Sequence, residues 1–125
     1  MCIRDSSKSW AKEFMKDANI PTAKFWKVNS LEEAKKIINS SSIPLVVKAD
    51  GLASGKGVFI PNSKDECLKA TESIFNGKFG NSGNIVVLEE KIQGPEVSVF
   101  ALCDGERYTL PVSYTHLTLP TSDLV

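Results

Sequence analysis

The sequence has no excess of either charge. Fifteen lysine and arginine residues balance fifteen aspartate and glutamate residues in a chain of 125. Proteins that bind nucleic acids or anionic membranes usually carry a basic excess, so this balance argues against both partners. No stretch approaches the roughly 18 apolar residues of a membrane-spanning helix, and no signal-peptide apolar segment follows Met1. The length suits one domain at most, or a piece of a larger protein.

Cysteine is scarce and irregularly spaced. The three cysteines, Cys2, Cys67 and Cys103, are an odd number without C-x-x-C spacing, so neither a disulfide framework nor a zinc site is predicted. We interpret them as reduced thiols of a cytoplasmic protein. Cys67 falls on the apolar side of a predicted helix, where we expect it to pack.

The two ends differ from the interior. Residues 1–6 (MCIRDS) and 112–125 (VSYTHLTLPTSDLV) continue no periodicity and resemble translated sequencing-adapter sequence. We therefore predict two non-native ends and exclude them from the fold, as one would an expression tag. The alternative is a genuine frayed start and a short threonine-rich strand at the end. Excluding the ends removes His116, the only histidine, from any catalytic pairing.

The interior predicts three helices. Large apolar residues recur at helical spacing over residues 8–18, and the Ile20-Pro21 pair ends that pattern. Two Ser-x-x-Glu capping boxes, at residues 30–33 and 63–66, predict the start of two more helices. Each box is followed by an apolar stripe, formed by Leu31, Ala34, Ile37 and Ile38 in one helix and by Cys67, Leu68, Thr71, Ile74 and Phe75 in the other.

Strands are predicted between and after these helices. Their ranges are 23–28, 45–47, 58–60, 85–88 and 96–103, the last closing at the Asp104-Gly105 turn. The stretch GKFGNSGN at residues 77–84 is predicted as a loop. The fold class is therefore α+β, with a hairpin around the glycine-rich segment.

That glycine-rich segment, residues 44–60, is the strongest functional signal. It reads PLVVKADGLASGKGVFI, with Lys48 on the strand before the loop 51–57. Glycines permit positive φ and let amide N–H groups approach a ligand, while lysines add charge for phosphate oxygens. The spacing G-x-x-x-G-K-G fits neither a Walker A loop nor G-x-G-x-x-G, and a strand follows where both motifs need a helix. The alternative is a flexible hairpin with incidental lysines. The candidate phosphate-binding residues are Lys48, Gly51, Ser54, Gly55, Lys56 and Gly57.

A second candidate segment, VVLEEKIQGPEVSVF, covers residues 86–100. An apolar strand, two glutamates, a Gly-Pro turn and another strand suit a hinge that holds an adenine. Glu89 or a nearby carbonyl is the candidate acceptor for the exocyclic amine of the adenine. The backbone at Lys91 and Ile92 is the candidate N–H donor to a ring nitrogen, and Glu96 is the candidate contact to the ribose hydroxyls. Surface carboxylates beside a hairpin are the alternative. A metal pair of Glu89 with Glu90 is disfavoured, because adjacent strand residues point to opposite faces.

Several strings together resemble one family. KADGLASGKGV, preceded by PLVV and followed after about thirty residues by VVLEE, resembles the ATP-grasp domain of the phosphoribosylamine–glycine ligases, also called glycinamide ribonucleotide synthetases. Residues 7–25, GKFGNSGN and GPEVSVFALCDG are similar to the same family. The resemblance covers residues 7–110 and implies an ATP-grasp fold, represented by the small subdomain that covers ATP and the first strands of the next subdomain.

The resemblance also implies a reaction. Members use ATP and magnesium to join glycine to 5-phosphoribosylamine through glycyl phosphate, in purine synthesis. The resemblance implies that Lys48 and the 51–57 loop bind the phosphates of ATP, with Lys8 as a further contact. It implies that residues 89–92, including Glu90, bind the adenine, and that Glu96 binds the ribose. The family's QDHK-like segment is replaced after residue 110, so we expect a fragment whose metal ligands and catalytic residues lie elsewhere. The alternatives are another ATP-grasp carboxylate–amine ligase or carboxylase, or a non-catalytic nucleotide-binding module.

Overall fold

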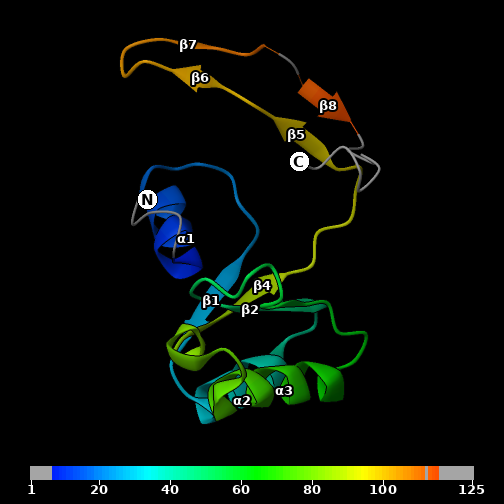
Figure 1. The fold of residues 1–125 in the computed structure, drawn as a ribbon. Coiled ribbons are helices and arrows are strands. Elements are labelled where there is room, and N and C mark those ends of the chain that lie inside the picture. Colours follow the sequence, from blue (N-terminus) through cyan, green and yellow to red (C-terminus); the bar gives the residue numbers. More distant parts are fainter. Residues whose placement is uncertain (1–6, 112, 116–125) are drawn as a thin grey trace, which may run out of the picture. The chain divides into compact units, whose positions relative to one another are not determined.

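The computed structural model describes residues 7–111 and 113–115. The chain divides into two units, the first ending at Ile92 and the second beginning at Gln93 (Figure 1). No helix in the described part of the chain is long and apolar enough to cross a membrane.

The first unit is a four-stranded antiparallel sheet with three α-helices. Its elements, in chain order, are α1 (Lys8–Asp17), β1 (Phe25–Val28), α2 (Leu31–Ser40), β2 (Leu45–Ala49), β3 (Val58–Phe59), α3 (Lys64–Ser73), a π-helical turn (Ile74–Lys78), a 3-10 turn (Gly80–Gly83) and β4 (Val86–Glu90). The strand order in the sheet is β1-β4-β2-β3. The predicted α+β class and the hairpin around the glycine-rich segment, formed by β2 and β3, are confirmed.

One face of the sheet forms the hydrophobic core. In the first unit α2 and α3 lie side by side beneath this face (Figure 1). The core consists of Val28, Ala34, Ile38, Leu45, Val47, Ala49, Cys67, Ile74, Val86 and Leu88. Both predicted apolar stripes contribute to it, and Cys67 packs there as expected. Burial raises the pKa of the Cys67 thiol to about 11, because the thiolate would lose its hydration.

The capping boxes form as predicted, with one difference. Ser30 Oγ accepts from Glu33 N–H at 3.2 Å. The Glu33 carboxylate returns to the N–H of Asn29, the residue before the cap, at 3.0 Å. Helix α3 repeats this arrangement with Ser63, Glu66 and Asn62. Each helix therefore begins with two backbone donors satisfied by local side chains.

Helix α1 forms where the spacing predicts it, but it buries a different face. Trp10 and Phe14 are 41% and 51% exposed, and their rings stack with centroids 5.4 Å apart. The buried residues are Ser9 and Lys12. The reason is that α1 contacts β4 on the side of the sheet that carries charged residues, so its polar side chains find partners there.

The segment predicted as a loop at residues 77–84 is an irregular connection that contains short helical turns. Helix α3 continues into the π-helical turn and then the 3-10 turn, with Gly77 and Gly80 at positive φ. Gly83 passes so close to Ile74 that a Cβ would lie 2.5 Å from the Ile74 carbonyl oxygen. Composition alone indicated a loop, but these glycines allow a compact helical connection.

The described residues of the second unit form two short two-stranded antiparallel sheets. The strand predicted at 96–103 is divided into β5 (Val97–Val99) and β6 (Leu102–Cys103). β6 pairs with β7 (Tyr108–Thr109) across the predicted Asp104 turn, and β5 pairs with β8 (Ser113–Thr115). Backbone hydrogen bonds from Arg107 and Glu106 lower the pKa of Asp104 and hold the turn. The non-native origin proposed for residues 112–125 stays a prediction. Residues 1–6 and His116 lie outside the described residues.

Candidate functional site

The second face of the sheet carries charge. Val46 pairs with Glu89 and Lys48 with Val87, so these four side chains share the face opposite the core. Leu45, Val47 and Ala49 point the other way and are buried. This alternation places Lys48 and Glu89 on the side of the sheet that α1 contacts, and Lys48 lies near the end of β2 that leads into the glycine-rich loop.

Glu89 is the centre of a buried ion-pair cluster. Its Oε2 accepts from Lys48 Nζ at 2.7 Å, and its Oε1 accepts from Lys12 Nζ at 2.8 Å. Lys12 Nζ also donates to Thr22 Oγ1 at 2.6 Å. Three elements, α1, β2 and β4, therefore meet at one carboxylate.

The cluster fixes the charge of Glu89. Burial by itself would raise the pKa of this carboxyl group, because it disfavours the charged form. The hydrogen bonds and positive charges of Lys12 and Lys48 outweigh burial and hold the pKa below its ordinary value. Glu89 is thus an anion with both oxygens engaged, and its predicted contact with an adenine amine stays a prediction.

Lys8 hydrogen-bonds to the backbone at the start of the loop. Its Nζ donates to the carbonyls of Ala49 and Gly51, at 2.8 and 3.0 Å, and its backbone N–H donates to Asp50 O at 3.0 Å. Burial lowers the pKa of Lys8, the charge of Asp50 opposes that shift, and the nearby charge of Lys48 adds to it. Lys8 and Lys48 are therefore near enough for the charge of one to affect the pKa of the other.

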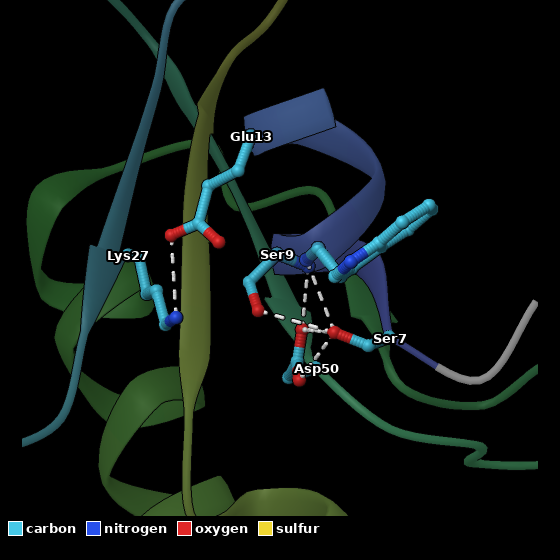
Figure 2. A network of polar contacts seen from close by, with 6 residues as sticks. Ser7, Ser9, Glu13, Lys27 and Asp50 are labelled. Atoms are coloured by element: carbon cyan, nitrogen blue, oxygen red, sulfur yellow. Dashed lines mark hydrogen bonds and ion pairs between the residues drawn. The ribbon is translucent and has the colours of Figure 1, made fainter. Parts of the chain in front are cut away.

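Asp50 ties α1 to the loop (Figure 2). Its carboxylate accepts from the Ser9 N–H and from Ser7 Oγ, while Ser7 Oγ caps the helix. A carboxylate at a helix N-terminus is also favoured by the helix dipole. Figure 2 further shows the Glu13–Lys27 pair, at 3.2 Å, which joins α1 to β1. The contacts of Asp50 thereby hold the start of α1 against the start of the loop.

The tip of the loop is a tight turn. Lys56 N–H donates to Ala53 O at 2.8 Å, and both central residues, Ser54 and Gly55, have positive φ, at 49° and 73°. Two consecutive positive φ values are the pattern of a type I′ hairpin turn. Ser54, Gly55 and Lys56 are exposed there. Positive φ, expected for the glycines of this loop, therefore holds for Gly55.

Gly51 and Gly57 are required for a different reason. Neither has positive φ, but a Cβ on Gly57 would lie 2.5 Å from Ala53 Cβ, and one on Gly51 would lie 2.6 Å from Ser82 Oγ. Ser82 Oγ also donates to Leu52 O at 2.9 Å. These two glycines let the chain fold closely on itself, and the 3-10 turn supports the loop from behind.

The hinge residues separate into distinct environments. Glu90 lies on the core side of β4, opposite Leu45, so it points away from Glu89. Lys91 N–H donates to Pro44 O at 3.0 Å, whereas Ile92 has no backbone bond among those recorded for the described residues and is 69% exposed. Glu96 is exposed and belongs to the second unit.

The structure thus brings together Lys8, Lys48, Gly51 and Glu89, and leaves the loop tip exposed. Sequence reasoning missed Lys12 and Asp50. Lys12 follows Lys8 by four residues, which places both lysines on one side of a helix, and this spacing was the available signal. No group of three or more metal-binding side chains occurs among residues 7–111 and 113–115.

Sequence comparisons find a family and close relatives. Residues 6–123 match the family described as phosphoribosylglycinamide synthetase, ATP-grasp (A) domain. The phosphoribosylamine–glycine ligase of Leptospira interrogans is 46% identical over 114 residues, which are 90% of this chain and 27% of that protein. The ligase of the same name from Nostoc is 48% identical over 101 residues, 81% of this chain and 24% of the relative.

Structural comparisons find the same kind of protein. The crystal structure of phosphoribosylamine–glycine ligase from Thermotoga maritima aligns with a TM-score of 0.78 at 38% identity, over 84% of this chain and 27% of that one. D-alanyl-alanine synthetase A from Vibrio cholerae aligns with a TM-score of 0.73 over 96% of this chain and 36% of that one, at 16% identity, which supports the fold alone. The chain spans about a quarter of the length of its phosphoribosylamine–glycine ligase relatives.

Proposed function

The chain belongs to the phosphoribosylglycinamide synthetase ATP-grasp (A) domain family, and from this membership we propose that it is the ATP-binding part of a longer ligase that joins glycine to 5-phosphoribosylamine. The observation that carries the proposal is the placement of two lysines at the start of the glycine-rich loop: Lys8 Nζ donates to Gly51 O, and Lys48, near enough to Lys8 to affect its pKa, pairs with Glu89. The fold expected for this family, α+β ATP-grasp, is the one observed.

The residues of this chain would act on the nucleotide. Lys8 and Lys48 would neutralise phosphate oxygens, and the amides of the 51–57 loop would donate to them. The end of β4 would hold the adenine, with the Ile92 N–H as the available backbone donor, because Lys91 N–H is engaged by Pro44 O. Glu96 would accept from the ribose.

The longer ligase would carry out two displacements. The glycine carboxylate attacks the γ-phosphate of ATP and gives glycyl phosphate and ADP. The amine of 5-phosphoribosylamine then attacks the glycyl carbonyl and releases phosphate. Positioning and charge stabilisation would be the contribution of the protein. Magnesium would neutralise the polyphosphate, but the described residues offer it no cluster of ligands, so we assign it none here.

We also place this ligase in the cytoplasm. The two cysteines in the described part of the chain, Cys67 and Cys103, are both free. Free thiols are ordinary in a reducing compartment. Its partners would be the small molecules ATP, glycine and 5-phosphoribosylamine.

A substitution of Lys48 tests the proposal. In the longer ligase, Lys48→Ala should raise the Kd for ATP about 10- to 150-fold, because a charge-assisted hydrogen bond contributes ~1.5–3 kcal/mol. Lys35→Ala removes an exposed lysine of α2 and is the matched control. Unchanged ATP affinity in Lys48→Ala would show that Lys48 has a structural role only.

The reaction is tested separately. Glycine-dependent ADP release should need the longer protein, and its product should change when 5-phosphoribosylamine is added. The 125-residue chain should show no turnover and at most weak ATP binding, because it spans only about a quarter of the length of its ligase relatives. ADP release that requires a different carboxylate in place of glycine would overturn the assignment.

A further inference from the structure

Glu89 is a buried carboxylate that two lysines share. The residue is 9% exposed, and each of its oxygens accepts from one ammonium group. A buried charge without a partner is destabilising, so when either lysine is removed the other alone must balance the charge of Glu89. The cluster therefore couples α1 to the strand that leads into the glycine-rich loop.

The two lysines are not equivalent. The Lys12 side chain is 11% exposed, has Thr22 Oγ1 as a second acceptor and lies 6.0 Å from the centre of the Phe25 ring. The Lys48 side chain is 25% exposed, and Glu89 is the one acceptor recorded for its Nζ within the described part of the chain. Lys12 is thus held on three sides, whereas Lys48 lies at the open edge of the cluster.

We propose that Lys12 is a positioning residue for nucleotide binding: it keeps Glu89 fixed and charged, so that Lys48 can turn its N–H donors toward a phosphate. The inference rests on the proposed function, because it takes Lys48 as the residue that touches the nucleotide. Lys12 itself makes no contact with ATP in this scheme.

The reason is a competition for Lys48. When Lys48 donates to a phosphate, it interacts less strongly with Glu89. The positive charge of Lys12 then still balances the negative charge of the buried carboxylate. Without Lys12, Glu89 would depend on Lys48 alone and would compete with the phosphate for it. Lys27, on the neighbouring strand β1, pairs with Glu13 at 3.2 Å and makes no recorded contact with Glu89 within the described part of the chain.

The test uses the longer ligase with ATP as the probe. Lys12→Met should raise the Kd for ATP about tenfold, within the roughly 5- to 150-fold usual for coupling between sites, and should raise KM for ATP more than it lowers kcat. Lys12→Arg keeps the charge and should restore most of the affinity. Lys16→Met, an exposed lysine on the same helix, is the matched control and should change the Kd less than about twofold.

A double-mutant cycle separates positioning from direct contact. With Glu89→Gln in place the charge is gone, so adding Lys12→Met should change the Kd for ATP less than about threefold. A direct contact of Lys12 with the nucleotide would instead give the same tenfold loss in both backgrounds. Where Lys12→Met alone fails to fold, the double variant and Glu89→Gln carry the comparison, since the double variant leaves no unpaired carboxylate.

The outcomes distinguish the two proposals. A wild-type ligase that binds no ATP overturns the proposed function and, with it, the role of Lys12. A wild-type ligase that binds ATP, with Lys12→Met equal to it or with equal losses in both Glu89 backgrounds, overturns the role of Lys12 alone.

Discussion

Replacing Gly57 by alanine tests whether the glycine-rich loop is built by close packing. A Cβ at this position would lie 2.5 Å from Ala53 Cβ and 3.2 Å from Ala49 Cβ. Carbon atoms in good contact are ~3.5–4.0 Å apart, so the first contact is short by roughly 1 Å. The backbone has little room to shift, because Gly57 O accepts from Ala49 N–H at 2.7 Å.

The cost follows from this overlap. Overpacking of a well-packed site costs about 1–3 kcal/mol, so Gly57→Ala should lower the free energy of unfolding by that amount. For a unit of roughly 100 residues each kcal/mol corresponds to about 5 °C, which gives a Tm lower by about 5–15 °C. Urea unfolding followed by circular dichroism measures the free energy, and a thermal scan measures the Tm.

Two further variants make the test specific. Gly94→Ala adds a Cβ with no atom within 4 Å and should change the stability by less than about 0.5 kcal/mol. Ala53→Gly combined with Gly57→Ala removes the opposing Cβ and should recover part of the loss. If Gly57→Ala is as stable as the wild type, or if the second substitution recovers nothing, the packing argument is wrong.

Two other predictions concern titratable groups. Because the folded-state pKa of Glu89 lies below its unfolded value of ~4.3, its stabilisation is complete above that value and is lost as the pH falls through the folded pKa. The stability difference between wild type and Glu89→Gln, measured by urea unfolding, should therefore shrink from pH 7 to roughly pH 3, and a constant difference would contradict it. Cys103 is exposed and Cys67 buried with a raised pKa, so iodoacetamide at pH 8 should label Cys103 faster than Cys67, as read by peptide mapping. Equal labelling rates in the folded chain would show that Cys67 is accessible.

Local signals predicted much of the fold. The two Ser-x-x-Glu boxes act within four residues, so both helix starts could be located from the sequence. The strand after the first box, β2, was found from its apolar residues, and β3 from its place after the glycines. The 3-10 turn within residues 77–84 was not predicted, because the composition of this segment is that of a loop and the turn brings Gly83 close to Ile74, which is not visible in the local sequence.

The site was predicted less completely, because its key contacts are distant in sequence. Lys48 in an apolar strand indicated that a partner was needed, but the bond to Glu89 crosses 41 residues and that of Lys12 crosses 77. The apolar spacing of α1 gave a helix without indicating what the helix lies against. Asp50 was overlooked because its partners, Ser7 and Ser9, belong to the cap of that helix.

The strict alternation along β2 has a consequence for how this strand tolerates change. Leu45, Val47 and Ala49 face the core, and Val46 and Lys48 face the charged side. A saturation mutagenesis scan of residues 45–49 that records abundance and ligand binding separately should therefore show two interleaved patterns. Substitutions at the odd positions should lower mainly abundance, whereas substitutions of Lys48 should lower ATP binding more than abundance, because Lys48 is also a partner of the buried Glu89. Within this one five-residue strand, selection for folding and selection for ligand binding would then act on alternate positions.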